Sequence, residues 1–376
     1  MRILIAADSF KDALPATAVC AEIADGIHNR NPTVETIEFP LGDGGEGTLD
    51  VLRHHLKLHE VNVATDDPLG RPIGGHYGIS ADRTTAVIEM AVASGLQLLG
   101  HEERDPLRAS TFGTGRLIAH AVGQGVSRIV LAIGGSATND GGIGVAAALG
   151  WQFVDADGAT LAPVGGSLSR ISSIIPPATA FPAIDVEVIC DVDNPLCGSR
   201  GAAAVYGPQK GADTEAVAAL DAGLANLARC MAEQHGKVDF ADRAGAGAAG
   251  GMGYGAMVFM NAQLARGIDL IMELTGFSQA LAAADLVITG EGALDSQTLH
   301  GKLISGICDK ARTMNKPVLA LCGRLAADAE QIHQVGLADA FSINLEIKPL
   351  AEMLAATGAN LRRTAASLDL ARYLPR

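Results

Sequence analysis

Short apolar runs alternate with helix-like segments at both ends of this chain. Residues 2–7 form one apolar run, and behind it Val19, Ile23 and Ile27 recur every four residues, as on one face of a helix. Three further runs occur near the other end, at 285–289, 317–321 and 339–343. Strand–helix alternation predicts a parallel sheet covered by helices. We therefore expect the two ends of the chain to build one discontinuous α/β domain.

The middle of the chain has a different pattern. Three strand-like runs, at 59–65, 73–79 and 85–91, are separated by turn-like segments, which is typical of an antiparallel meander. A helix is predicted further on, over 214–235. Because 376 residues suggest two domains, we predict a mixed α/β domain at 59–280, inserted into a domain made of 1–58 plus 281–376.

Composition and charge exclude several classes of protein. The net charge is -14 without a Lys/Arg cluster, so a nucleic-acid partner is not expected, and an anionic substrate must be held by local donors. Six cysteines without a CxxC pair fit a reducing compartment. The first residues enter a strand without a signal-peptide pattern, and no apolar run approaches the ~20 residues that span a bilayer. We expect a cytoplasmic protein without a membrane partner.

Two polar loops lie near the start of the chain. Asp8, Ser9 and Lys11 follow the first strand and offer an anion and hydroxyl site, although Asp8 and Ser9 could instead cap the next helix. Residues 42–47 match GxGxxG, but their acids would repel a pyrophosphate. Carboxylates on a glycine loop suit Mg²⁺, and a tight turn with solvated acids is the alternative.

Two glycine-rich segments lie in the predicted inserted domain. A strand at 128–133 runs into residues 134–142, rich in glycines and hydroxyls, where backbone N–H groups can approach a phosphate closely. This is the strongest signal that the residues give on their own. Residues 245–253 also match GxGxxG, but no strand leads into them, so a mobile hinge and close helix packing remain equally open.

Two further acidic segments end predicted strands. In residues 190–195, Asp191 and Asn194 could hold a metal or accept a hydroxyl proton, and Glu291 lies in a similar segment at 289–295. Ordinary turn chemistry is an equal alternative for both. The chain has no GxxxxGK[ST], GxSxG or HExxH motif, and its histidines form no cluster with metal-ligand spacing.

These segments, taken together and in order, resemble the bacterial glycerate kinase family of the type that makes 2-phosphoglycerate. The matching stretches are residues 7–11, 43–48, 67–72, 88–91, 113–115, 134–142, 191–196, 206–211, 245–251 and 288–292. Ala293 departs from the family, which usually has a basic residue there. The resemblance implies two dissimilar α/β domains, one of them Rossmann-like or flavodoxin-like, with the active site in the cleft between them.

The resemblance also implies the reaction: ATP and Mg²⁺ phosphorylate (R)-glycerate to 2-phosphoglycerate in glucarate, galactarate or glyoxylate catabolism. The alternatives are a kinase that forms 3-phosphoglycerate, an NAD(P)-dependent dehydrogenase of a small hydroxy acid, and a non-catalytic sugar-acid binding protein. We expect a monomer or homodimer.

Residue roles follow as hypotheses. The predicted catalytic residues are Asp8, Lys11 and Asp191, with Lys11 offsetting negative charge and an aspartate accepting the hydroxyl proton. The predicted substrate and phosphate contacts are Ser9, Gly134, Gly135, Ser136, Thr138, Asn139 and Glu291. The predicted metal ligands are Asp43, Glu46 and Asp191.

Overall fold

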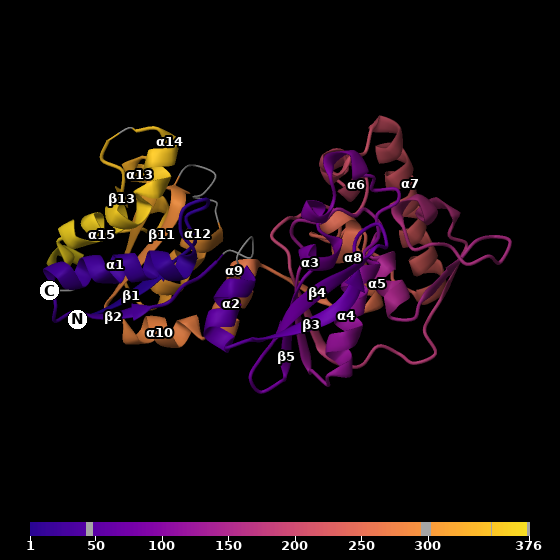
Figure 1. Ribbon diagram of the computed structural model, residues 1–376, viewed down its shortest axis with the longest axis horizontal. Coiled ribbons are helices and arrows are strands. Elements are labelled where there is room, and N and C mark those ends of the chain that lie inside the picture. The colour runs from indigo at the N-terminus through magenta and orange to yellow at the C-terminus, as the bar shows by residue number, and fades with distance from the viewer. Residues whose placement is uncertain (43–47, 295–301, 347, 374–376) are drawn as a thin grey trace. The chain divides into compact units, whose positions relative to one another are not determined.

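The chain divides into two compact α/β units. The computed structural model describes residues 1–42, 48–294, 302–346 and 348–373. The terminal unit comprises Met1–His55 and Gly267–Arg376, and the central unit comprises Leu56–Arg266 (Figure 1). The chain thus returns to the terminal unit at residue 267, before the predicted boundary at residue 280. Two helices, α9 (Gly267–Thr275) and α10 (Phe277–Ala283), belong to the terminal unit, and strand patterns alone did not indicate this.

The terminal unit contains the predicted parallel sheet. Its five strands have the order β13-β12-β11-β1-β2, and every neighbouring pair is parallel. Their bounds are β1 Arg2–Ala7, β2 Glu35–Glu38, β11 Leu286–Leu294, β12 Val318–Leu325 and β13 Asp339–Ser342. Ile3, Leu4 and Ile5 are all fully buried, because a central parallel strand is covered on both faces.

Helices of the terminal unit pack on this sheet. On one face α1 (Ala16–Arg30) lies beside α15 (Thr357–Ser367), as Figure 1 shows. Gly26 allows this close approach, because a Cβ there would lie 2.3 Å from the carbonyl oxygen of Arg362. The sheet also contacts α10 and α12 (Lys302–Thr313). The remaining helices are α2 Thr48–Leu56, α13 Ala329–Val335 and α14 Leu350–Ala355.

The strand order of the terminal unit indicates at which edge of its sheet a ligand is expected to bind. β1 pairs with β2 on one side and with β11 on the other, so the chain reverses its direction across the sheet between β1 and β11. In open α/β sheets, ligands bind outside the carboxyl ends of the strands at such a reversal. The ends of β1 and β11 are therefore the expected edge of the site in this unit.

The central unit has a separate mixed sheet in the order β10-β9-β6-β5-β4-β3. The strands are β3 His59–Asp66, β4 Pro72–Ile79, β5 Thr85–Glu89, β6 Arg128–Ala132, β9 Asp185–Ile189 and β10 Gln263–Ala265. The first three form the predicted antiparallel meander, which is confirmed. From β5 to β10 the pairing is parallel, so the unit combines both kinds of ladder.

Helices and a short hairpin complete the central unit. The helices are α3 Ala91–Ser94, α4 Phe112–Gly123, α5 Ile143–Ala148, α6 Ala202–Tyr206, α7 Thr214–His235 and α8 Ala248–Phe259. The hairpin pairs β7 (Gln152–Val154) with β8 (Ser173–Ile175). Among the described residues, no helix is both long enough and apolar enough to cross a membrane.

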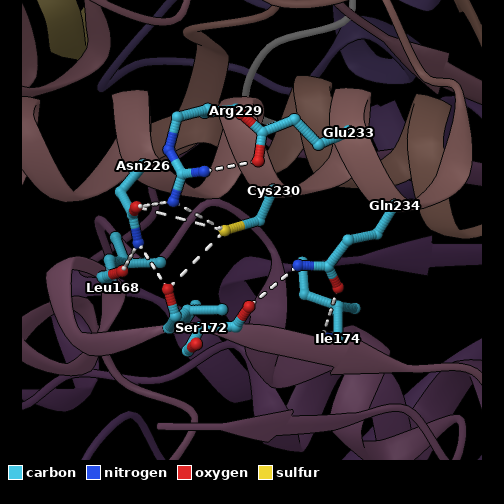
Figure 2. Close-up of polar contacts among 9 residues, drawn as sticks. Leu168, Ser172, Ile174, Asn226, Arg229, Cys230, Glu233 and Gln234 are labelled. Atoms are coloured by element: carbon cyan, nitrogen blue, oxygen red, sulfur yellow. Dashed lines mark hydrogen bonds and ion pairs between the residues drawn. The ribbon is translucent and has the colours of Figure 1, made fainter. Parts of the chain in front are cut away.

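Helix α7 matches the predicted helix from its first residue to its last. Asp213 caps its start by accepting from the backbone of Ala216, and Gly236 ends it with φ 67°. Figure 2 shows how its side chains hold the hairpin region. Asn226 donates to the carbonyl oxygens of Leu168 and Ile171, both at 2.9 Å. These bonds satisfy backbone acceptors that the helix would otherwise bury.

Candidate functional site

Asp8 and Ser9 extend strand β1 at the edge where it meets β11. The backbone N–H of Asp8 donates to the carbonyl of Gly290 at 2.9 Å, which continues the ladder by one residue. The Asp8 carboxylate accepts from the Ser9 backbone at 2.6 Å and from the Ser9 hydroxyl at 3.3 Å. Neither residue caps α1, because its N-cap is Pro15 without a side-chain bond. The helix-cap interpretation was therefore wrong.

The structure brings four predicted residues together around one cavity of the terminal unit. Asp8, Ser9, Lys11 and Glu291 line a cavity of about 970 Å³. The strand register explains this: Ala7 of β1 pairs with Gly290 of β11, so the residues that follow emerge side by side. The predicted metal ligands Asp43 and Glu46 lie outside the described residues.

Two cations line this cavity. Lys11 and Arg324 are both exposed, and within the described ranges neither side chain makes an ion pair or a hydrogen bond. Most of the other arginines that the structure describes form ion pairs, as Arg2 does with Glu35. Sequence analysis missed Arg324, although it lies near the end of β12, next to β11. Two unpaired cations on one cavity favour an anionic ligand.

In the central unit, the loop at residues 134–142 follows β6 and is mostly buried. Gly134 and Gly135 are exposed, whereas Ser136 to Asp140 are buried. The Asp140 carboxylate accepts from the Thr111 backbone and hydroxyl, both at 2.8 Å. Burial raises the pKa of Asp140, although hydrogen bonds from Thr111, Gly142 and Gly144 oppose the shift. This carboxylate holds the loop from inside.

Lys210 is a fully buried cation under the same loop. Its Nζ donates to Ser136 Oγ at 2.7 Å and to the carbonyl of Thr138 at 2.6 Å. Burial lowers the pKa of Lys210 to about 7, against the attraction of Asp140. Sequence analysis assigned no role to Lys210, because the stretch at 206–211 contributed only to the family resemblance. Lysines are rarely fully buried, and the two hydrogen bonds tie this one to the loop at residues 134–142.

Thr138 and Asn139 have buried polar atoms without partners. Within the described residues, Thr138 Oγ1 and both amide atoms of Asn139 make no hydrogen bond, and both side chains are fully buried. Each such atom costs ~1–3 kcal/mol until it is paired. These two predicted phosphate-binding residues therefore have side-chain atoms available for a partner.

The second glycine segment packs directly against this loop. Gly250, at φ +72°, lies so close that a Cβ would be 2.0 Å from the carbonyl oxygen of Thr138. The backbone N–H of Gly141 donates to the Gly250 carbonyl at 3.0 Å. Of the two interpretations of residues 245–253, the structure bears out close packing. Glycine is required because no side chain fits between the two backbones.

Asp191 lies at the same sheet edge as the loop at residues 134–142. It follows β9, which runs parallel to β6 with Ile189 opposite Ala132, so both strands end on one side. Asn194 is held in a local network, accepting from Tyr206 at 2.7 Å. Among the described residues, no group of three or more His, Cys, Asp or Glu side chains could hold a metal.

Polar strand ends and buried glycine loops of this kind are typical of α/β enzymes that bind small anions. Comparison with known proteins agrees. A model of the glycerate kinase family matches residues 3–373. The glycerate kinase of Bacillus subtilis (strain 168) is 41% identical, covering 100% of this chain and 99% of its own. The glycerate 2-kinase of Escherichia coli (strain K12) is 39% identical over 98% and 97%.

A solved structure leads to the same family. A Salmonella typhimurium LT2 protein, provisionally described as glycerate kinase 2, superposes with a TM-score of 0.88 at 43% identity. The match covers 97% of this chain and 96% of that chain. This chain belongs to the glycerate kinase family.

Proposed function

We propose that this protein is a cytoplasmic kinase that transfers the γ-phosphoryl group of ATP to (R)-glycerate and forms 2-phosphoglycerate in sugar-acid catabolism. Family membership supports a glycerate kinase, and the Escherichia coli relative named glycerate 2-kinase supports the 2-product. The observation that carries the proposal is that Asp8, Ser9, Lys11 and Glu291 line one cavity at the carboxyl ends of β1 and β11.

Phosphoryl transfer requires alignment, charge neutralisation and an acceptor for the hydroxyl proton. In this proposal Lys11 offsets charge on the phosphates, and Asp8 or Asp191 accepts the proton of the glycerate hydroxyl. The exposed backbone of Gly134 and Gly135 holds phosphate oxygens. Asp140 and Lys210 keep that loop in shape from below.

The donor set of the terminal cavity fits Mg²⁺. Asp8, Asp50 and Glu291 line it with carboxylate oxygens, the ligands that this cation prefers. Mg²⁺ is usually held by one or two carboxylates together with substrate phosphates, which suits a chain whose described residues form no larger metal cluster. When bound, the cation would supply positive charge to the phosphate oxygens. Asp191 remains a proposed ligand from the central unit.

The test is a coupled assay of ADP formation with a series of small hydroxy acids. We expect glycerate to stimulate ADP formation well above lactate, glycolate and tartrate. A protein that hydrolyses or transfers nothing with any of these acids would not be a glycerate kinase. A spectroscopic titration with NADH tests the dehydrogenase alternative in parallel, and we expect no binding, since α8 has no strand leading into its glycine motif.

A further inference from the structure

The cavity of the terminal unit has two chemically different walls. One is polar and comes from the ends of β1, β11 and β12; its members include Asp8, Ser9, Lys11, Glu291 and Arg324. The other is apolar and comes from the loop before α1 and from α14; its members are Leu14, Pro15, Leu350, Met353 and Leu354. A ligand that fits both walls carries charge at one end and an apolar face at the other.

The apolar wall on α14 combines one strongly exposed side chain with two half-buried ones. Leu350 leaves 67% of its surface accessible. Met353 and Leu354 lie three and four positions on, which places all three on the same face of the helix. An apolar helix face that borders a cavity and is partly exposed marks a binding surface more often than a single scattered leucine does. Methionine adapts its shape to a flat ring.

The volume of the cavity distinguishes between ATP and glycerate as its ligand. Its volume of about 970 Å³ is at the upper end of the roughly 300–1,000 Å³ that is typical for pockets of drug-sized ligands. Glycerate is a three-carbon acid with polar groups on every carbon, so it neither fills this space nor uses an apolar wall. A nucleoside triphosphate does both, because its base is flat and largely apolar on its faces.

The charges match the other end of a nucleotide. Lys11 and Arg324 are cations that no residue in the described part of the chain pairs with. Asp8 and Glu291 stand on the same wall, and they would repel a bare triphosphate but not its complex with a divalent cation. The polar wall therefore suits the metal-bound phosphate chain of a nucleotide.

We propose that this cavity is the ATP site. The adenine base lies against Leu350, Met353 and Leu354 of α14, and the phosphates point toward Lys11 and Arg324. The inference rests on the proposed function for the presence of ATP, and it adds which unit and which wall hold the base. Glycerate then makes its own contacts away from α14.

The test compares two exposed leucines of the same unit. Leu350→Ser removes the most exposed side chain that α14 contributes to the apolar wall. Leu345→Ser is the matched control, since Leu345 is 76% exposed and does not line the cavity. In the full-length protein, we expect Leu350→Ser to raise the KM for ATP and the calorimetric Kd for MgADP about tenfold. The KM for glycerate should stay within twofold, and Leu345→Ser should match wild type throughout.

A charge variant probes the other wall. Arg324→Gln should raise the Kd for MgADP about tenfold and leave the thermal unfolding temperature unchanged, because the side chain is exposed. Unchanged MgADP affinity in both Leu350→Ser and Arg324→Gln would overturn the proposal, as would wild-type protein that binds no MgADP. A rise confined to the KM for glycerate in Leu350→Ser would assign the cavity to glycerate instead.

The calorimetric arm keeps this inference separate from the proposed function. Wild-type protein that binds MgADP with the expected dependence on Leu350, yet phosphorylates no glycerate, would support the nucleotide site while contradicting the kinase assignment. If the protein phosphorylates glycerate but Leu350→Ser leaves its affinity for ATP unchanged, the kinase assignment would be supported and the nucleotide site contradicted.

Discussion

Lys11 and Asp191 are the residues on which the proposed chemistry depends most. Replacing either by Ala should lower kcat about 10²–10³-fold, the usual loss when a group that stabilises transition-state charge, here Lys11, or a general base, here Asp191, is removed. The fold should persist, because Lys11 is exposed and Asp191 is only partly buried. Steady-state kinetics and thermal unfolding measure both effects.

Matched controls exist for each change. Lys310 is an exposed lysine of α12 away from the cavity, and Asp193 is an exposed neighbour of Asp191 whose partner is Arg200. Lys310→Ala and Asp193→Ala should keep kcat within a few-fold of wild type. Near-normal kcat in both Lys11→Ala and Asp191→Ala would remove these two residues from the mechanism.

Lys210 should make the stability of the protein depend on pH in the alkaline range. Its pKa is lowered from 10.5 to about 7 in the folded state. Between these values the unfolded lysine still holds a proton that the folded one has lost, so unfolding takes up a proton and the free energy of unfolding rises with pH. Below pH 7 both states are protonated and this contribution is constant.

Denaturant unfolding at several pH values measures this effect. From pH 7 to pH 9, wild type should gain ~2 kcal/mol relative to Lys210→Met, which cannot titrate. Lys310→Met, at an exposed site, should keep the wild-type dependence. Parallel curves for wild type and Lys210→Met would show that the buried amine does not titrate in this window.

At the scale of elements, the contact between the glycine segment of α8 and the loop at residues 134–142 leaves no room for a side chain. Gly250→Ala should cost about 2–5 kcal/mol, because alanine is strained at φ +72° and its Cβ would meet the carbonyl of Thr138. Thermal unfolding and the KM for ATP are the readouts, and both should worsen.

Gly123→Ala is the control for that change. Gly123 ends α4, and a Cβ there meets nothing within 4 Å. Alanine should leave stability unchanged or raise it by up to ~1 kcal/mol. If Gly250→Ala were as harmless as Gly123→Ala, the packing of α8 against the loop would not be tight in solution.

Local patterns predicted the elements well wherever one face is buried. The meander and α7 follow from periodicity and turn residues, and both were found as predicted. Sequence patterns did not predict the residues whose placement depends on tertiary contacts. Lys210 lies in the stretch at 206–211, for which the sequence analysis predicted no structure, and only the fold shows that its side chain is buried under a distant loop. Arg324 likewise joins the cavity through the pairing of β12 with β11.

At the scale of the whole molecule, the strand patterns indicated correctly that a second unit is inserted into the first. The position at which the chain returns to the terminal unit could not be predicted. Helices α9 and α10 precede the first C-terminal strand, and their sequences do not show to which unit they belong. Sheet topology decides which side chains meet within each unit, and hydrophobic periodicity carries no information about that topology.

Removing divalent cations should stop the reaction without unfolding the molecule. The described residues form no cluster of three or more metal-ligating side chains, so a cation that arrives with the nucleotide is not expected to hold the fold together. Excess chelator should reduce ADP formation to background, added Mg²⁺ should restore it, and the unfolding temperature should not move. A large fall in that temperature would reveal a structural metal instead.

Phosphorus NMR of the product tests the central claim most directly. After incubation of the protein with ATP, Mg²⁺ and (R)-glycerate, we expect the spectrum to show ADP and a single new phosphomonoester that matches authentic 2-phosphoglycerate. A resonance that matches 3-phosphoglycerate would contradict the assigned product, and a spectrum in which ATP is left intact would contradict the account as a whole.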